Sequence, residues 1–123
     1  MSPTRWFDRA ALMAALPGWV VARILVAVAF VVADAIVAEQ GLSPRPLHLD
    51  EGLVTWDGDF YEQLARSGYE GVPFEAIRFF PLFPALGWLL GGPLGGNHGV
   101  ALLLVANVAA LAAAMALRGL VRD

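Results

Sequence analysis

Cysteine is absent from the 123-residue sequence, and so is lysine. Without cysteine the chain has no disulfide and no thiolate metal site. The two histidines, His48 and His98, stand far apart in the sequence, and neither indicates a metal site. All eight basic residues are arginine, and the net charge is −3. This balance argues against a nucleic-acid partner.

Apolar residues are in excess, at 59% of the chain, whereas a soluble domain lies nearer half. They form three blocks, at residues 18–38, 79–94 and 100–117. A helix as long as the first block covers about 30 Å, the thickness of a bilayer core. We therefore predict an all-α membrane domain over residues 1–123. It would have about three transmembrane helices and lie, as a multi-pass protein, in a bacterial plasma membrane.

A secretory signal is the alternative for the first block. Arg5 and Arg9 would form its basic start, and Ala33–Ala35 resembles a small-x-small cleavage site. The block is longer than the about 7–15 apolar residues of a typical signal, and two more blocks follow, which favours an uncleaved span. Residues 1–16 would form a separate interfacial helix, because Pro17 and Gly18 follow it.

The segment of residues 39–77 is the main polar region and carries eight acids against two arginines. Arg5 and Arg9 place the N-terminus in the cytoplasm by the positive-inside rule, so this acidic loop would be extracytoplasmic. Three spans would then leave Arg118 and Arg122 outside as well, which opposes the same rule. The composition alone also fits a merely solvated loop.

Short-range signals place smaller elements. Asp59 and Glu62 have capping-box spacing, which predicts a short helix to about Arg66, ended by Ser67–Gly68. Pro81 and Pro84 suit the first turn of the second span, and residues 91–99 read as a turn. In the third block, Ala106, Ala110 and Ala114 predict a packing face of small residues, and Asn107 predicts an interhelical hydrogen bond.

Several residues then form an ordered pattern: Trp56-Asp57-Gly58-Asp59-Phe60-Tyr61, Ala65, Gly68-Tyr69, Glu75 and Phe79-Phe80-Pro81-Leu82-Phe83-Pro84. This pattern resembles the PIG-V type of mannosyltransferase, in the GT-C class of polytopic glycosyltransferases. Phe83 replaces the tyrosine usual in that family. Family members are much longer, so the resemblance implies that the chain is the N-terminal piece of such an enzyme, inactive by itself.

The resemblance implies transfer of mannose from a polyprenyl or dolichyl phosphate carrier to an acceptor hydroxyl, with inversion. Such chemistry needs a carboxylate to accept the hydroxyl proton, and positive charge or a divalent metal ion at the departing phosphate. The partners would be membrane lipids, the lipid-linked donor and the remaining helices of the enzyme. Candidate substrate contacts are Trp56, Asp59, Tyr61, Tyr69, Glu75, Arg78 and Asp34.

Asp57 is the candidate catalytic base, because it lies beside an aromatic ring and precedes a glycine that permits close approach. A turn or capping role is the alternative. Asp59 has a structural explanation as the helix cap. Asp50 and Glu51 fit either a metal site or the start of a short helix through Trp56, and the helix start is favoured.

Arg78 could contact the lipid phosphate or snorkel to the headgroups. Within the first span, Arg23 and Asp34 share one helix face, because eleven residues make about three full turns. A membrane-buried carboxylate such as Asp34 is a functional candidate. The alternative to the enzyme is a small non-enzymatic membrane protein, either an assembly subunit or a piece of a transporter.

Overall fold

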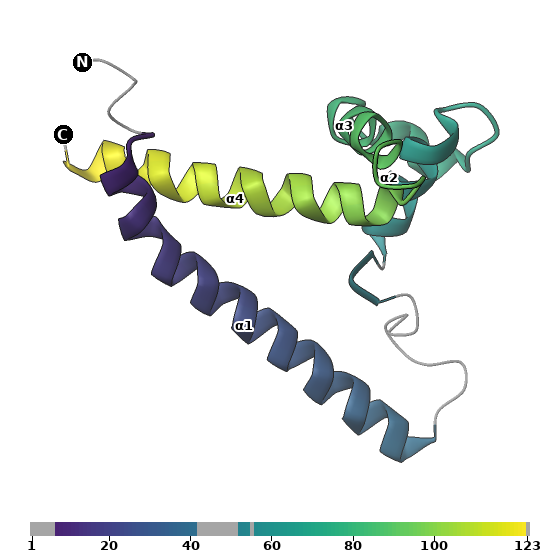
Figure 1. Cartoon of the computed structure of the whole chain (residues 1–123). Coiled ribbons are helices and arrows are strands. Elements are labelled where there is room, and N and C mark those ends of the chain that lie inside the picture. The colour runs from purple at the N-terminus through teal and green to yellow at the C-terminus, as the bar shows by residue number, and fades with distance from the viewer. Residues whose placement is uncertain (1–6, 42–51, 55, 123) are drawn as a thin grey trace. The chain divides into compact units, whose positions relative to one another are not determined.

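The computed structural model describes residues 7–41, 52–54 and 56–122, and all of its regular elements are helical (Figure 1). The elements are α1 (Arg9–Gln40), α2 (Asp57–Ser67), the 3-10 helix η3 (Phe74–Arg78), α3 (Leu82–Gly91) and α4 (His98–Arg122). The chain divides into two compact units. One contains α1 and the part of α4 from Asn107 onward, and the other contains α2, η3, α3 and the first turns of α4. The all-helical prediction is confirmed for the described residues.

Helix α1 is continuous through Pro17, so the predicted separate N-terminal helix is wrong. Proline removes one backbone donor, the one that would bond to the carbonyl of Met13, and the helix continues for two turns or more on either side. Apolar membrane helices tolerate such an interruption. The Asp8 side chain caps the start by accepting a hydrogen bond of 2.7 Å from the Ala11 N–H. Gly41, in the left-handed conformation, ends the helix.

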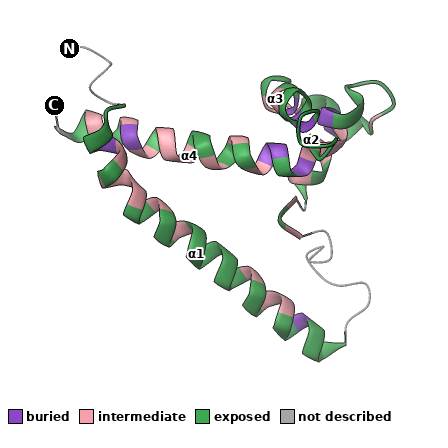
Figure 2. Ribbon diagram, viewed as in Figure 1, coloured by how far each residue is buried: buried purple, intermediate pink, exposed green. Residues whose placement is uncertain are grey.

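Two helices are long and apolar enough to cross a membrane, Arg9–Gln40 and His98–Val121. Few of their residues are buried: those of α1 are mostly exposed, and those of α4 are mostly half-buried or exposed (Figure 2), which is compatible with insertion into lipid. The predicted second span over residues 79–94 is not confirmed, because its helical part, α3, has only 10 residues. A helix of that length covers about 15 Å, half of the bilayer core. Gly95 and Gly96, with φ of 68° and 83°, follow α3 and prevent its extension.

Helix α2 ends as predicted, with Gly68 as its C-cap, but it begins earlier than the capping-box signal indicates. Its first residue is Asp57, and no side chain caps it. Asp59 instead accepts a 2.6 Å hydrogen bond from Gln63, and Glu62 pairs with Arg66 at 2.6 Å. The prediction of a capping box is therefore wrong, because the two carboxylates instead contact Gln63 and Arg66, each one turn further along the helix. Asp57 and Asp59 still favour the helix start, since acids stabilise the N-terminal end of the helix dipole.

The second unit has a small core in which backbones approach closely. Its buried residues gather on α2, α3 and the first turns of α4 (Figure 2). A Cβ added to Gly87 of α3 would lie 2.6 Å from Leu102 of α4 and 3.1 Å from Ala65 of α2. One added to Gly91 would overlap the ring of His98. Glycine is therefore required at these two positions for the three helices to pack. As predicted, Pro81 and Pro84 stand at the start of α3, where a missing N–H is tolerated.

Candidate functional site

An aromatic cluster joins α2 to the segment between η3 and α3. The ring of Phe79 stacks on Phe60 with 5.6 Å between centroids and meets Tyr61 at 4.7 Å. Tyr61 also makes an edge contact of 4.9 Å with Phe83 of α3. Such pairs stabilise by about 0.5–1.5 kcal/mol each beyond their buried area. The cluster holds the apolar face of α2 against the Phe-Phe-Pro segment.

Two polar side chains complete this cluster from its edges. The hydroxyl of Tyr69 donates a hydrogen bond of 2.6 Å to the carbonyl of Phe79. The guanidinium of Arg78 lies 5.3 Å from the centroid of the Phe79 ring, within the range of a cation–π contact. Phe79 is therefore the residue on which Tyr61, Tyr69 and Arg78 converge. Sequence reasoning placed Phe79 only in a motif, because nothing local shows that Tyr61 and Tyr69, both ten or more residues away in the sequence, contact it.

Asp57 and Asp59 lie on different faces of α2. Two residues of helix correspond to about 200° around the axis, so the side chains point in nearly opposite directions. Asp57 shares a face with Phe60 and Tyr61, which lie three and four residues further on. It therefore flanks the aromatic cluster, whereas Asp59 faces Gln63. Both carboxylates are exposed, so Asp57 is open to a ligand beside the aromatic rings.

Trp56 has an unusual backbone conformation, with φ of 58° and ψ of −120°. A bulky side chain in the left-handed region costs about 1–3 kcal/mol and is found mainly where surrounding structure or function requires it. Here the residue turns the chain into α2, and its carbonyl accepts a hydrogen bond of 3.1 Å from the Asp59 N–H. The side chain is 61% exposed. Among the described non-glycine residues, Trp56 is thus the one with positive φ, which its position in the sequence did not indicate.

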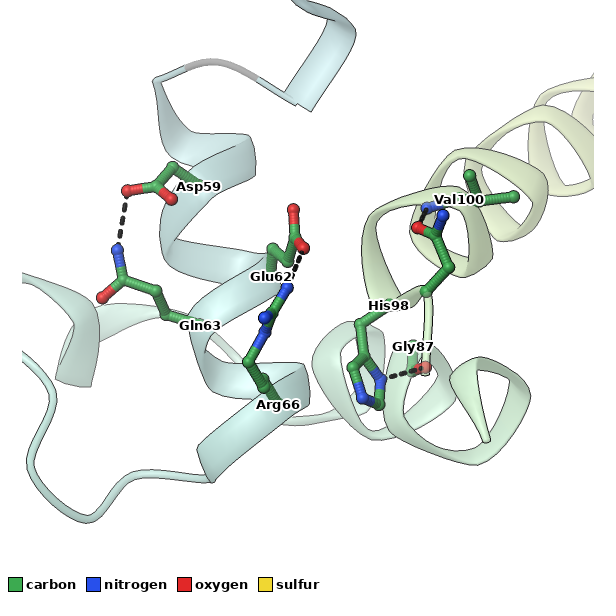
Figure 3. A network of polar contacts seen from close by, with 8 residues as sticks. Asp59, Glu62, Gln63, Arg66, Gly87, His98 and Val100 are labelled. Carbon is green, nitrogen blue, oxygen red and sulfur yellow. Dashed lines mark hydrogen bonds and ion pairs between the residues drawn. The ribbon is translucent and has the colours of Figure 1, made fainter. Parts of the chain in front are cut away.

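Glu62 and His98 form contacts that sequence reasoning missed (Figure 3). The Glu62 carboxylate pairs with Arg66, and its other oxygen lies 2.8 Å from the place of a Cβ on Gly99, in the first turn of α4. The His98 ring nitrogen Nδ1 lies 3.2 Å from the Gly87 carbonyl, to which the protonated ring nitrogen donates. The four-residue spacing of Glu62 and Arg66 predicts their pairing. The contacts with α4 have no signal in the sequence.

The remaining candidates are not brought to this cluster by any contact in the described residues. Glu75 is exposed on η3, and Asp34 is half-buried in α1, within the other unit. His48, Asp50 and Glu51 lie outside the described residues, as does the proposed helix start at Asp50. Among the residues that the structure describes, no three histidine or acidic side chains group as ligands for one metal ion.

Comparisons of the chain with protein families, with characterised proteins and with solved structures found no match. The residues of the aromatic cluster, and the motifs that contain them, are therefore the features of the chain that point to a function.

Proposed function

We propose that the chain is the N-terminal part of a glycosyltransferase that moves a sugar, mannose by the resemblance, from a polyprenyl phosphate to an acceptor hydroxyl. One observation supports this most directly. Three motifs of the resemblance, separated in sequence, contact one another in the second unit. Tyr61 of the tryptophan-aspartate segment packs on Phe79 and Phe83 of the Phe-Phe-Pro segment, and Tyr69 of the Gly-Tyr pair bonds to Phe79.

The roles follow from position. Asp57 is the base that accepts the acceptor's proton, because it is exposed on the helix face that carries the aromatic cluster. Tyr61 and Trp56 offer rings on which a sugar can stack, and Tyr69 ties the segment after α2 to Phe79. Arg78, exposed beside the Phe79 ring, supplies positive charge for the departing phosphate. Asp59 and Glu75 belong to the outer edge of the site and contribute less to substrate binding.

Transfer assays on the full-length enzyme test this function. Membranes that contain it should move radiolabelled mannose from polyprenyl-phosphate mannose to a lipid or protein acceptor, and membranes from a deletion strain should not. A polyprenyl-phosphate glucose donor serves as the matched control for the sugar. Transfer of glucose alone would keep the reaction class but change the donor. Absence of transfer from either donor would favour the non-enzymatic membrane protein.

The membrane topology proposed here has two spans, α1 and α4, with α3 lying at partial depth. The chain then returns to the side on which it began, so that Arg9 and Arg118 both lie in the cytoplasm. This arrangement removes the conflict with the positive-inside rule that three spans create. The acidic segment of residues 39–77 lies outside the cell.

Cysteine labelling tests this topology directly, because the chain has no cysteine of its own. In intact cells an impermeant thiol reagent should label Ser67→Cys, whereas it should label Val121→Cys only after the membrane is permeabilised. Labelling of both from outside would support three spans. Labelling of Val121→Cys alone from outside would reverse the orientation.

A further inference from the structure

Within the first unit, three residues of α1 and α4 form a polar group, here called the Arg23 cluster: Trp19, Arg23 and Asn107. The Arg23 guanidinium donates a hydrogen bond of 3.1 Å to the side-chain oxygen of Asn107. The Trp19 indole N–H donates one of 3.1 Å to the Asn107 backbone carbonyl. The guanidinium also lies 5.7 Å from the centroid of the Trp19 ring. Both helices of this unit thus take part in holding one cation.

The Arg23 cluster lies deep within the two candidate spans. Trp19 is about 15 Å along α1 from Arg9, and Asn107 is about 16 Å along α4 from Arg118, by the rise of a helix. Two successive spans run antiparallel through the membrane. These similar separations therefore place Arg9 and Arg118 at the same depth, on the same side of the Arg23 cluster. Arg23 itself is about 21 Å from Arg9 and about 16 Å from Asp34. Both separations exceed the length over which an arginine side chain can snorkel.

The two helices do not compensate this charge. Between Arg9 and Asp34 the sequence of α1 contains no acid, and α4 contains none over its whole length. Asn107 is neutral and offers an acceptor to a guanidinium that carries five N–H donors. A cation at the centre of a membrane helix costs about 2.5–3.5 kcal/mol and is normally paired within the protein interior. The side chain of Arg23 is exposed in this unit, and is therefore accessible to a further partner.

We propose that the Arg23 cluster docks another transmembrane helix that carries a carboxylate at the same depth. A carboxylate matches the planar guanidinium with two parallel hydrogen bonds, which neither an amide nor a hydroxyl provides. A parallel second copy of this chain does not meet the need, because it brings its own Arg23 to that level. A lipid phosphate does not meet it either, since phosphates lie at headgroup depth. The proposal rests on α1 and α4 both spanning, which the cysteine labelling tests separately.

The test uses residues 1–123 reconstituted in phosphatidylcholine vesicles with a fluorescent donor. The probe is a synthetic leucine-alanine transmembrane helix with one central glutamate and an acceptor dye, and matched helices carry glutamine or leucine there. We expect energy transfer to show roughly tenfold or stronger association of the glutamate helix than of the leucine helix. Arg23→Leu should reduce it to the level of the leucine helix, whereas Arg23→Lys should retain part of it.

Arg9→Leu is the matched control, because it removes the same charge from the same helix at a different depth. It should leave association unchanged, and circular dichroism should show equal helix content in all variants. The proposal is overturned if the glutamate helix associates no better than the leucine helix, or if Arg23→Leu leaves its association intact. Equal binding of the glutamine helix would also overturn it, because a neutral acceptor would then suffice. Displacement of the glutamate helix by phosphatidylglycerol would overturn it too, because a lipid phosphate would then be the occupant.

Discussion

Asp57→Asn in the full-length enzyme is expected to lower kcat by about 10²-fold or more, the usual share of general-base catalysis. Asparagine keeps the size of the side chain but cannot accept the hydroxyl proton. The proton moves only in the transition state, so binding of the donor lipid should change little. Steady-state transfer assays over a range of donor concentrations separate the two effects.

Asp59→Asn is the matched control. It removes the same charge two residues along the same helical turn, but on a face away from the aromatic cluster. Asp59 accepts an exposed hydrogen bond from Gln63, and asparagine retains an acceptor there, so kcat should stay within about threefold of the natural enzyme. Equal large losses in both variants would indicate a site shared by the two carboxylates. A fully active Asp57→Asn enzyme would exclude Asp57 as the base and leave Asp34 or Asp50 for testing.

Gly87→Val is expected to have the largest effect on stability. The Cβ alone would approach Leu102 within 2.6 Å and Ala65 within 3.1 Å, and both neighbours are almost completely buried. Two further methyl groups enlarge the overlap, so α3 must move away from α2 and α4. Overpacking of this kind costs about 1–3 kcal/mol and sometimes more. Thermal unfolding of the purified protein in detergent, followed by circular dichroism, measures the loss.

Gly18→Val provides the comparison for this variant. Gly18 is an exposed residue within α1, and nothing lies within 4 Å of an added Cβ. Its stability should therefore differ by less than about 0.5 kcal/mol from that of the natural chain. If both variants unfolded alike, the close approach of α3 to Leu102 would not be a determinant of stability.

The elements that depend on short-range chemistry were predictable from the sequence. The apolar composition of α1 and α4 indicates helices that can span a membrane, because burial in lipid requires apolar residues over about 20 positions. Gly68 ends α2 because glycine adopts positive φ values that other residues avoid. Pro81 precedes α3 because proline has no N–H to donate and its fixed φ suits the start of a helix.

Signals that compete with one another were misread at the helix starts. Pro17 resembles a break, but the helical turns on both sides of it carry the helix past one missing hydrogen bond. Asp59 resembles a cap, but its carboxylate bonds to Gln63, and the N-cap of the helix is Trp56, three residues earlier. In each case several local energies of about 1 kcal/mol oppose one another, and a single motif does not decide between them.

What the sequence by itself determined is therefore the helical class, the two apolar helices and the residue types of the candidate site. Only the tertiary structure decided that Tyr61 and Tyr69 converge on Phe79, that Glu62 reaches the first turn of α4, and that Asn107 holds Arg23. These contacts join residues from different elements, ten to eighty-four positions apart in the case of the two hydrogen-bonded pairs. Their formation depends on how the helices pack, and helical periodicity and turn chemistry act only over a few neighbouring residues.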